Sequence, residues 1–160
     1  MKILMPIDGT ELSLHEVRFA VRLIQQGLKA DFLLVNVQES ANLYEMVTAH
    51  DPEVIEKVSQ AAGEHALQPA LELLRASGIE AETAVVTGGD PADALVELVE
   101  EHGCELVITG SRGVGLLRSA LSGSVSQSLV HDSPVPVLLV KPPSEEESQP
   151  EGAGSGTKGR

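Results

Sequence analysis

The sequence has 160 residues, 42% of them hydrophobic, and a formal net charge of −13. This length fits one domain with its own core. The acidic balance argues against binding to nucleic acid or to an anionic membrane, because both depend on clusters of Lys and Arg. No apolar stretch approaches the roughly 18 residues of a membrane span. The single cysteine, Cys104, excludes an internal disulfide. We therefore expect a cytoplasmic protein in which Cys104 is a buried structural thiol.

Short apolar runs alternate with helical patterns along most of the chain. The run Phe32–Val35 predicts a central strand buried on both faces, whereas the alternation in residues 80–86 predicts a strand near an edge. Strands alternating with helices indicate an α/β fold with helices on both faces of a doubly wound parallel sheet. We expect the strand order 3-2-1-4-5. The expected strands cover residues 2–7, 31–37, 80–86, 105–109 and 136–141.

Apolar residues at steps of three and four predict helices between these strands. One helix is expected to begin near Pro52 and to end at Gly78, with Pro69 kinking or dividing it. Asp90 is expected to cap the next helix, with Pro91 at its first position. The last helix is expected over Val125–His131.

The end of the chain carries two further predictions. Val135–Val140 is an apolar strand expected at a sheet edge, and such an edge is a liability unless another chain covers it. We therefore expect a homodimer formed through this strand. Residues 142–160 are rich in Pro, Ser, Glu and Gly, which predicts a disordered tail after a domain of residues 1–141.

The most informative motif lies between the fourth strand and the last helix. It reads Gly110-Ser111-Arg112-Gly113, then nine residues, then Gly123-Ser124-Val125-Ser126. Glycine lets the backbone approach an anion closely, and the first N–H groups of a helix have no internal acceptor. This strand, glycine loop and helix therefore suit phosphate binding. Ser124 offers a further hydroxyl donor, and Arg112 is the only cation within the two glycine stretches.

Two common nucleotide motifs are absent from this segment. No Lys follows Gly123, so it is not a Walker loop, and Gly113-Val-Gly115 lacks the third glycine of a dinucleotide fingerprint. Taken alone, the glycines also fit a flexible connection, and Arg112 also fits a solvated loop residue. Efficient ATP hydrolysis is not expected, because no poised base can be named.

The expected strand order places the glycine segment beside the first turn of the chain. In open parallel sheets, ligands bind beyond the carboxyl ends of the strands where the strand order reverses. That point lies between the first and fourth strands, so Asp8 should face Gly110 across one cleft. Asp8 can accept a hydrogen bond from a ribose hydroxyl or an adenine amino group. It can also cap the first helix.

Together these residues resemble the nucleotide-binding universal stress proteins. The family signature, Gly-x2-Gly-x9-Gly-Ser/Thr, is met by Gly110, Gly113, Gly123 and Ser124, and the likeness extends over residues 1–141. The opening residues Pro6 to Thr10 also resemble the family's first strand and turn. The resemblance implies that Asp8 contacts the nucleoside, that the backbone of Val37 meets the adenine edge, and that residues 110–125 hold ribose and phosphates.

One position departs from the family pattern, because Asn36 stands where His is common. Recognition of adenine through the main chain of Val37 should survive this change. With aromatic residues at only 2%, adenine is expected between aliphatic groups such as Pro6, Ile7 and Val37. Five histidines show no paired metal-ligand spacing, so no protein metal site is expected.

The leading hypothesis is a stress or signalling module that binds ATP, or AMP or ADP, with Mg²⁺ as a further candidate near the phosphates. The ligand contacts are expected from the residues named above, including Ser111 and Ser126. The resemblance also implies a homodimer, and a protein partner of unknown identity is expected. Two alternatives stay open: a dimeric protein-interaction module with an empty glycine loop, and a slow ATP hydrolase.

Overall fold

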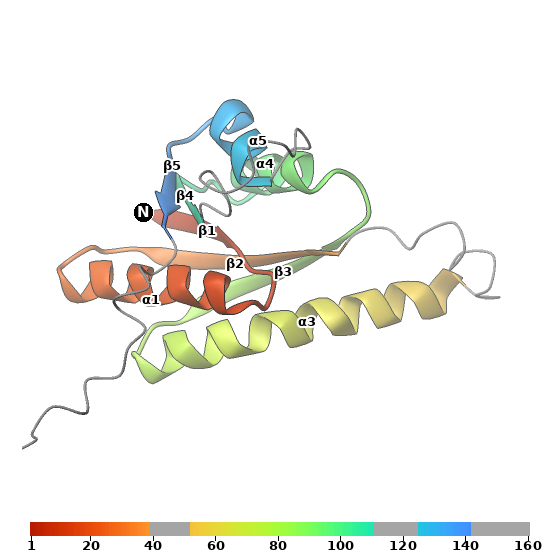
Figure 1. The fold of residues 1–160 in the computed structure, drawn as a ribbon, viewed down its shortest axis with the longest axis horizontal. Helices are drawn as coiled ribbons and strands as arrows, with labels where there is room; N and C mark the ends of the chain where they lie inside the picture. Colours follow the sequence, from red (N-terminus) through yellow and green to blue (C-terminus); the bar gives the residue numbers. More distant parts are fainter. Residues whose placement is uncertain (39–51, 111–124, 142–160) are drawn as a thin grey trace, which may run out of the picture.

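The computed structural model of the chain describes residues 1–38, 52–110 and 125–141. Five parallel strands form one sheet in the order β3-β2-β1-β4-β5 (Figure 1). The α/β class and the strand order predicted from the sequence are confirmed, and each strand boundary differs from the prediction by at most one residue. The strands are β1 (Lys2–Pro6), β2 (Asp31–Gln38), β3 (Ala81–Thr87), β4 (Leu106–Gly110) and β5 (Val137–Val140).

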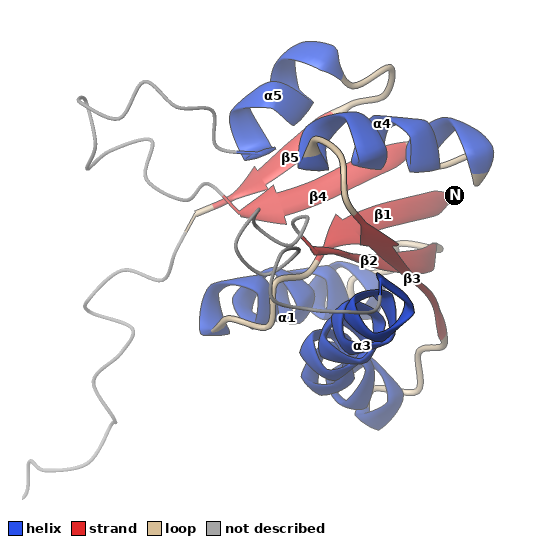
Figure 2. Cartoon of the chain, turned by 90° about the vertical axis from the view of Figure 1, so that its right-hand side faces the viewer, coloured by secondary structure: helices blue, strands red, loops and turns tan. Residues whose placement is uncertain are grey.

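Helices cover both faces of the sheet, as a doubly wound fold requires. In Figure 2, α1 (Glu11–Gln25) and α3 (Pro52–Ala76) lie against one face, while α4 (Pro91–Glu101) and α5 (Val125–Asp132) lie against the other. None of the helices in the described segments combines the length and the apolar character needed to cross a bilayer.

The alternation of side chains along β1 divides the core into two layers. Ile3 and Met5 pack toward α1 and α3, whereas Leu4 packs toward α4 and α5. Cys104 belongs to the second layer and is 5% exposed, and burial raises the pKa of its thiol. The prediction of a buried thiol is confirmed, and the raised pKa keeps the thiol protonated near neutral pH.

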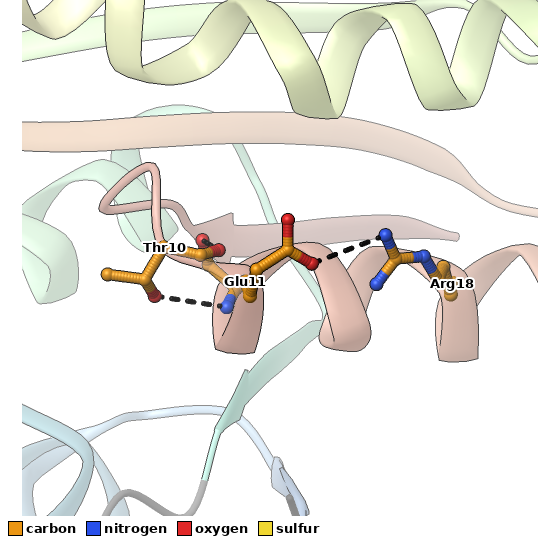
Figure 3. A network of polar contacts seen from close by, with 4 residues as sticks. Thr10, Glu11 and Arg18 are labelled. Atoms are coloured by element: carbon orange, nitrogen blue, oxygen red, sulfur yellow. Dashed lines mark hydrogen bonds and ion pairs between the residues drawn. The ribbon is translucent and has the colours of Figure 1, made fainter. Parts of the chain in front are cut away.

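The turn between β1 and α1 differs from the prediction in one respect. Thr10, not Asp8, caps α1, and its side chain accepts a hydrogen bond from the backbone N–H of Ser13. Asp8 instead supports the cap, because its Oδ1 accepts from the backbone N–H and the hydroxyl of Thr10 at 3.0 and 2.6 Å. Figure 3 shows Thr10 at the start of α1, with Glu11 paired to Arg18 on the exposed side. The Asp8 carboxylate is therefore held by the N-cap residue of α1.

Pro69 does not divide α3, which runs unbroken from Pro52 to Ala76. The helix is held in place by tertiary packing on either side of the proline, since Leu67 and Ala70 are both buried in the core. This packing outweighs the hydrogen bond that proline removes from a helix. The other predicted helix start is confirmed: Asp90 caps α4 and Pro91 occupies its first position.

Candidate functional site

The carboxyl ends of β2 and β4 extend beyond the end of β1. β1 ends at Pro6, opposite Val35, where the chain turns toward α1. β2 continues to Gln38, and β4 runs past its pairing with β1 to Gly110 beside β5. The strand order reverses at β1, so the chain opens a crevice here between the ends of β2 and β4.

A cavity of about 390 Å³ occupies this crevice. Its volume lies within the range typical of small-molecule sites. Seven of the twelve residues predicted for the site line it: Pro6, Ile7, Asp8, Val37, Gly110, Val125 and Ser126. The other five, Ser111, Arg112, Gly113, Gly123 and Ser124, lie outside the described residues, as does the predicted tail of residues 142–160. The structure thus brings Asp8 and Gly110 to one cavity, as the strand order predicted, together with Val37, which the family resemblance implied.

Seven further residues line the cavity that sequence reasoning did not name as site residues. Leu95 and Pro91 bring α4 to the wall, and Glu16 and Ser13 bring in α1. A helix face predicted from apolar residues alone cannot find Glu16 or Ser13, which are polar but buried at 4% and 2% exposure. The complete set is Ser13, Glu16, Val35, Asn36, Pro91, Leu95 and Thr109.

Asn36 ties the end of β2 to the loop that follows β1. It is 3% exposed, and its Nδ2 donates a 2.6 Å hydrogen bond to the carbonyl oxygen of Ile7. Its Oδ1 accepts from Nε2 of Gln38 at 2.5 Å. The backbone N–H of Ile7 also donates to the carbonyl oxygen of Val35 at 2.7 Å. Asn36 thus fixes the turn that carries Asp8, a role that the sequence did not reveal.

Gly110 is held on two sides at the point where the chain leaves β4. Its carbonyl oxygen accepts a 2.7 Å hydrogen bond from Oγ of Ser126, and its N–H donates to the carboxyl group of Glu16. A Cβ added at Gly110 would collide with Oε1 of Glu16. Glycine at this position therefore lets the carboxyl group of Glu16 approach the backbone, and a larger residue would force that side chain to shift.

The carboxyl group of Glu16 is the main electrostatic anomaly of the cavity. Burial raises its pKa to about 7, and the hydrogen bond from Gly110 opposes the rise. The second oxygen, Oε2, is buried and has no hydrogen-bond partner. Desolvation disfavours the charged form of an acid, so Glu16 is divided between its neutral and charged forms near neutral pH.

Several backbone donors near the cavity are already engaged. Oδ1 of Asp90 accepts hydrogen bonds from the N–H groups of Ala92 and Asp93, at 2.8 and 3.2 Å. The start of α4 is therefore occupied by its own cap and offers few free donors to an anion. Of the described residues that line the cavity, none is Lys or Arg, so a phosphate here must meet backbone or hydroxyl donors instead.

A profile of the universal stress protein family matches residues 1–141 of this sequence. The chain belongs to the universal stress protein family. Universal stress protein YxiE of Bacillus subtilis is 29% identical over 147 residues, which cover 88% of this chain and 98% of the relative. The resemblance seen in the glycine signature is thereby confirmed for the whole domain.

Solved structures of universal stress proteins share this fold. One, from Arabidopsis thaliana and with AMP bound, has a TM-score of 0.66 at 21% identity and covers 94% of this chain and 97% of its own. Another universal stress protein, in complex with cAMP, has a TM-score of 0.67 at 25% identity, with 88% and 96% covered. The two proteins hold different adenine nucleotides.

Proposed function

We propose that this universal stress protein binds an adenine nucleotide in the cavity at the end of β1. The observation that carries the proposal is the convergence of Asp8, Val37 and Gly110 on one cavity at the switch point of the sheet. Three segments far apart in sequence meet where open parallel sheets bind ligands. The AMP and cAMP held by related structures support the same ligand class.

The apolar part of the cavity suits the adenine ring. Val37 lies beyond the last β1–β2 pair, Pro6 with Val35, so this side of β2 faces the cavity rather than another strand. Its backbone is proposed to meet the adenine edge, with Pro6 and Ile7 as aliphatic contacts on the ring. The exposed Asp8 carboxylate is proposed to accept from a ribose hydroxyl, for which a charged acceptor is well suited.

The phosphates are proposed to lie along the segment from Gly110 to Val125. α5 begins at Val125 on the cavity wall, and the first N–H groups of a helix favour an anion. Arg112, Gly113, Gly123 and Ser124 are proposed to complete this contact. Mg²⁺ remains a prediction, and it would be bound mainly by phosphate oxygens, because the described residues contain no group of three ligating side chains.

The role is proposed to be that of a stress-response or signalling module rather than an efficient enzyme. A bound nucleotide acts as a signal when it changes the population of two states of its receptor. ATP, ADP and AMP all stay open as ligands. The contacts proposed for the described residues are mainly to the nucleoside, and these do not distinguish nucleotides by their number of phosphates. A homodimer through β5 and a cytoplasmic location are proposed alongside.

Calorimetry with AMP, ADP and ATP tests the binding proposal. Asp8→Ala should weaken all three nucleotides by about tenfold, because it removes one charge-assisted hydrogen bond to ribose. Asp31→Ala is the matched control, since Asp31 is an exposed carboxylate at the opposite end of the sheet. No heat of binding in the wild-type protein, or equal affinity in the Asp8 variant, would count against the proposal.

A further inference from the structure

Glu16 is buried at the edge of the nucleotide cavity without a function in the binding scheme above. It is 4% exposed, its Oε2 has no partner, and its carboxyl group accepts from the N–H of Gly110. An acid buried with one oxygen unsatisfied costs stability, which an apolar residue at the same helix position would avoid. The same carboxyl group lies against the residue that begins the proposed phosphate segment.

We infer that Glu16 is a positioning residue that couples nucleotide binding to protonation, taking up a proton when a phosphate binds beside Gly110. This inference rests on the proposed function. A phosphate near Gly110 repels a charged carboxylate in the same buried region and leaves a neutral carboxylic acid unaffected. Binding of an anionic nucleotide therefore draws in a proton, and by linkage the affinity falls as the pH rises.

Among the residues that the structure describes, none forms an ion pair with Glu16. β4, which packs against α1, has no titratable side chain between Leu106 and Gly110. Asp8 lines the same cavity, and as a second carboxylate it adds to the repulsion. The titratable residues in the middle and last turns of α3 are exposed: Glu64, His65, Glu72 and Arg75. On α1 itself, Glu11 and Arg18 form an exposed ion pair. Burial and the Gly110 hydrogen bond are the causes that set the pKa of Glu16.

Gly110 links the charge of Glu16 to the proposed phosphate site. Its N–H is held by Glu16 and its carbonyl oxygen by Ser126 at 2.7 Å, so the residue is held between α1 and α5. A neutral carboxylic acid holds the N–H less strongly than a carboxylate, because hydrogen bonds to charged acceptors are stronger. Protonation therefore loosens the hold on Gly110 as it removes the repulsive charge.

The inference is tested with AMP and the uncharged nucleoside adenosine, on wild-type protein and Glu16→Gln, between pH 5.5 and 8.5. Wild type and variant should bind AMP equally at pH 5.5, and the variant should bind it about tenfold more tightly at pH 8.5. AMP itself titrates near pH 6, but that effect is common to both proteins. Adenosine should show no such divergence.

The outcomes separate this inference from the proposed function. Parallel pH dependence of AMP binding in the two proteins would overturn the role of Glu16 and leave nucleotide binding intact. Failure of both proteins to bind AMP and adenosine would overturn both. Carbon NMR of wild-type protein labelled in its Glu carboxyl groups provides a measurement independent of the variant's folding. Saturating AMP should move the Glu16 midpoint to higher pH, and an unmoved midpoint would contradict the inference.

Discussion

The hydroxyl of Ser126 donates a 2.7 Å hydrogen bond to the carbonyl oxygen of Gly110, joining the start of α5 to the end of β4. Between these two residues the chain carries most of the glycine signature. Both ends of that segment are thus fixed to each other by a side chain. This contact also brings Oγ of Ser126 to 3.5 Å from the hydroxyl of Thr109.

Replacing Ser126 with Ala should therefore reduce both stability and nucleotide affinity. Loss of the hydrogen bond to Gly110 leaves a buried carbonyl oxygen with one partner fewer, which should lower the free energy of unfolding by about 1 kcal/mol. Urea unfolding measures this change, and calorimetry with AMP measures the affinity. Ser128→Ala on the same helix is the control, because Ser128 does not line the cavity. Equal stability of the two variants would contradict the prediction.

Glu16 should make stability depend on pH in a direction opposite to that of an ordinary paired carboxylate. The folded pKa of about 7 lies above the usual value of 4.5, so the folded protein holds a proton that the unfolded chain releases between these values. The folded state is therefore progressively destabilised as the pH rises from about 4.5 to above 7. A shift of this size corresponds to on the order of 3 kcal/mol.

The measurement is the free energy of unfolding of wild type minus that of Glu16→Gln at several pH values. This difference removes the titration of the other carboxyl groups, and it should decrease as the pH rises and level off above about pH 8. Glu11→Gln is the matched control on the same helix, since the Glu11 side chain is 84% exposed. A difference that stays constant between pH 5 and 8 would show that Glu16 has an ordinary pKa.

The sheet could be predicted from sequence because its strands are short apolar runs bounded by turn residues. Phe32, Leu33 and Leu34 are all buried, as expected of a strand covered on both faces. Pro69 shows the limit of such reasoning, because local rules forbid proline inside a helix while packing of Leu67 and Ala70 retains it. Tertiary contacts keep α3 continuous at Pro69, and the local sequence does not reveal such contacts.

The cavity was only partly predictable. Half of its described lining depends on which side of each helix faces the sheet and on where each strand ends. The buried side of α1 includes Ser13, Glu16 and Ala20 besides Val17 and Val21. A buried helix face predicted from large apolar residues alone omits the small and polar residues on the same face. Spacing offers a usable signal, since Ser13, Glu16 and Ala20 follow one another at steps of three and four. A buried acid on such a stripe then becomes a candidate functional residue.

Asp90→Ala should destabilise the domain through α4. The Asp90 carboxylate accepts from the N–H groups of Ala92 and Asp93, and loss of such a cap costs about 1 kcal/mol. Thermal unfolding should show a lower midpoint for this variant. Asp93→Ala is the control: it also removes a carboxylate from the first turn, but its effect through the helix dipole should be only a few tenths of a kcal/mol. A similar midpoint for both variants would argue against the capping role.

The exposed edge of β5 leads to a prediction about the proposed homodimer. Within the described residues β4 is the one strand paired with β5, and Leu139 on β5 is 39% exposed. Leu139→Lys places a charge on an apolar edge and should shift a dimer toward monomer, because a charged residue blocks edge-to-edge pairing. Light scattering at micromolar concentration measures the mass of each species. Val58→Lys on α3 is the control, since Val58 is 63% exposed and belongs to a different element. A wild-type monomer would contradict the proposed homodimer, whereas a Leu139→Lys variant as dimeric as the control would place the interface away from β5.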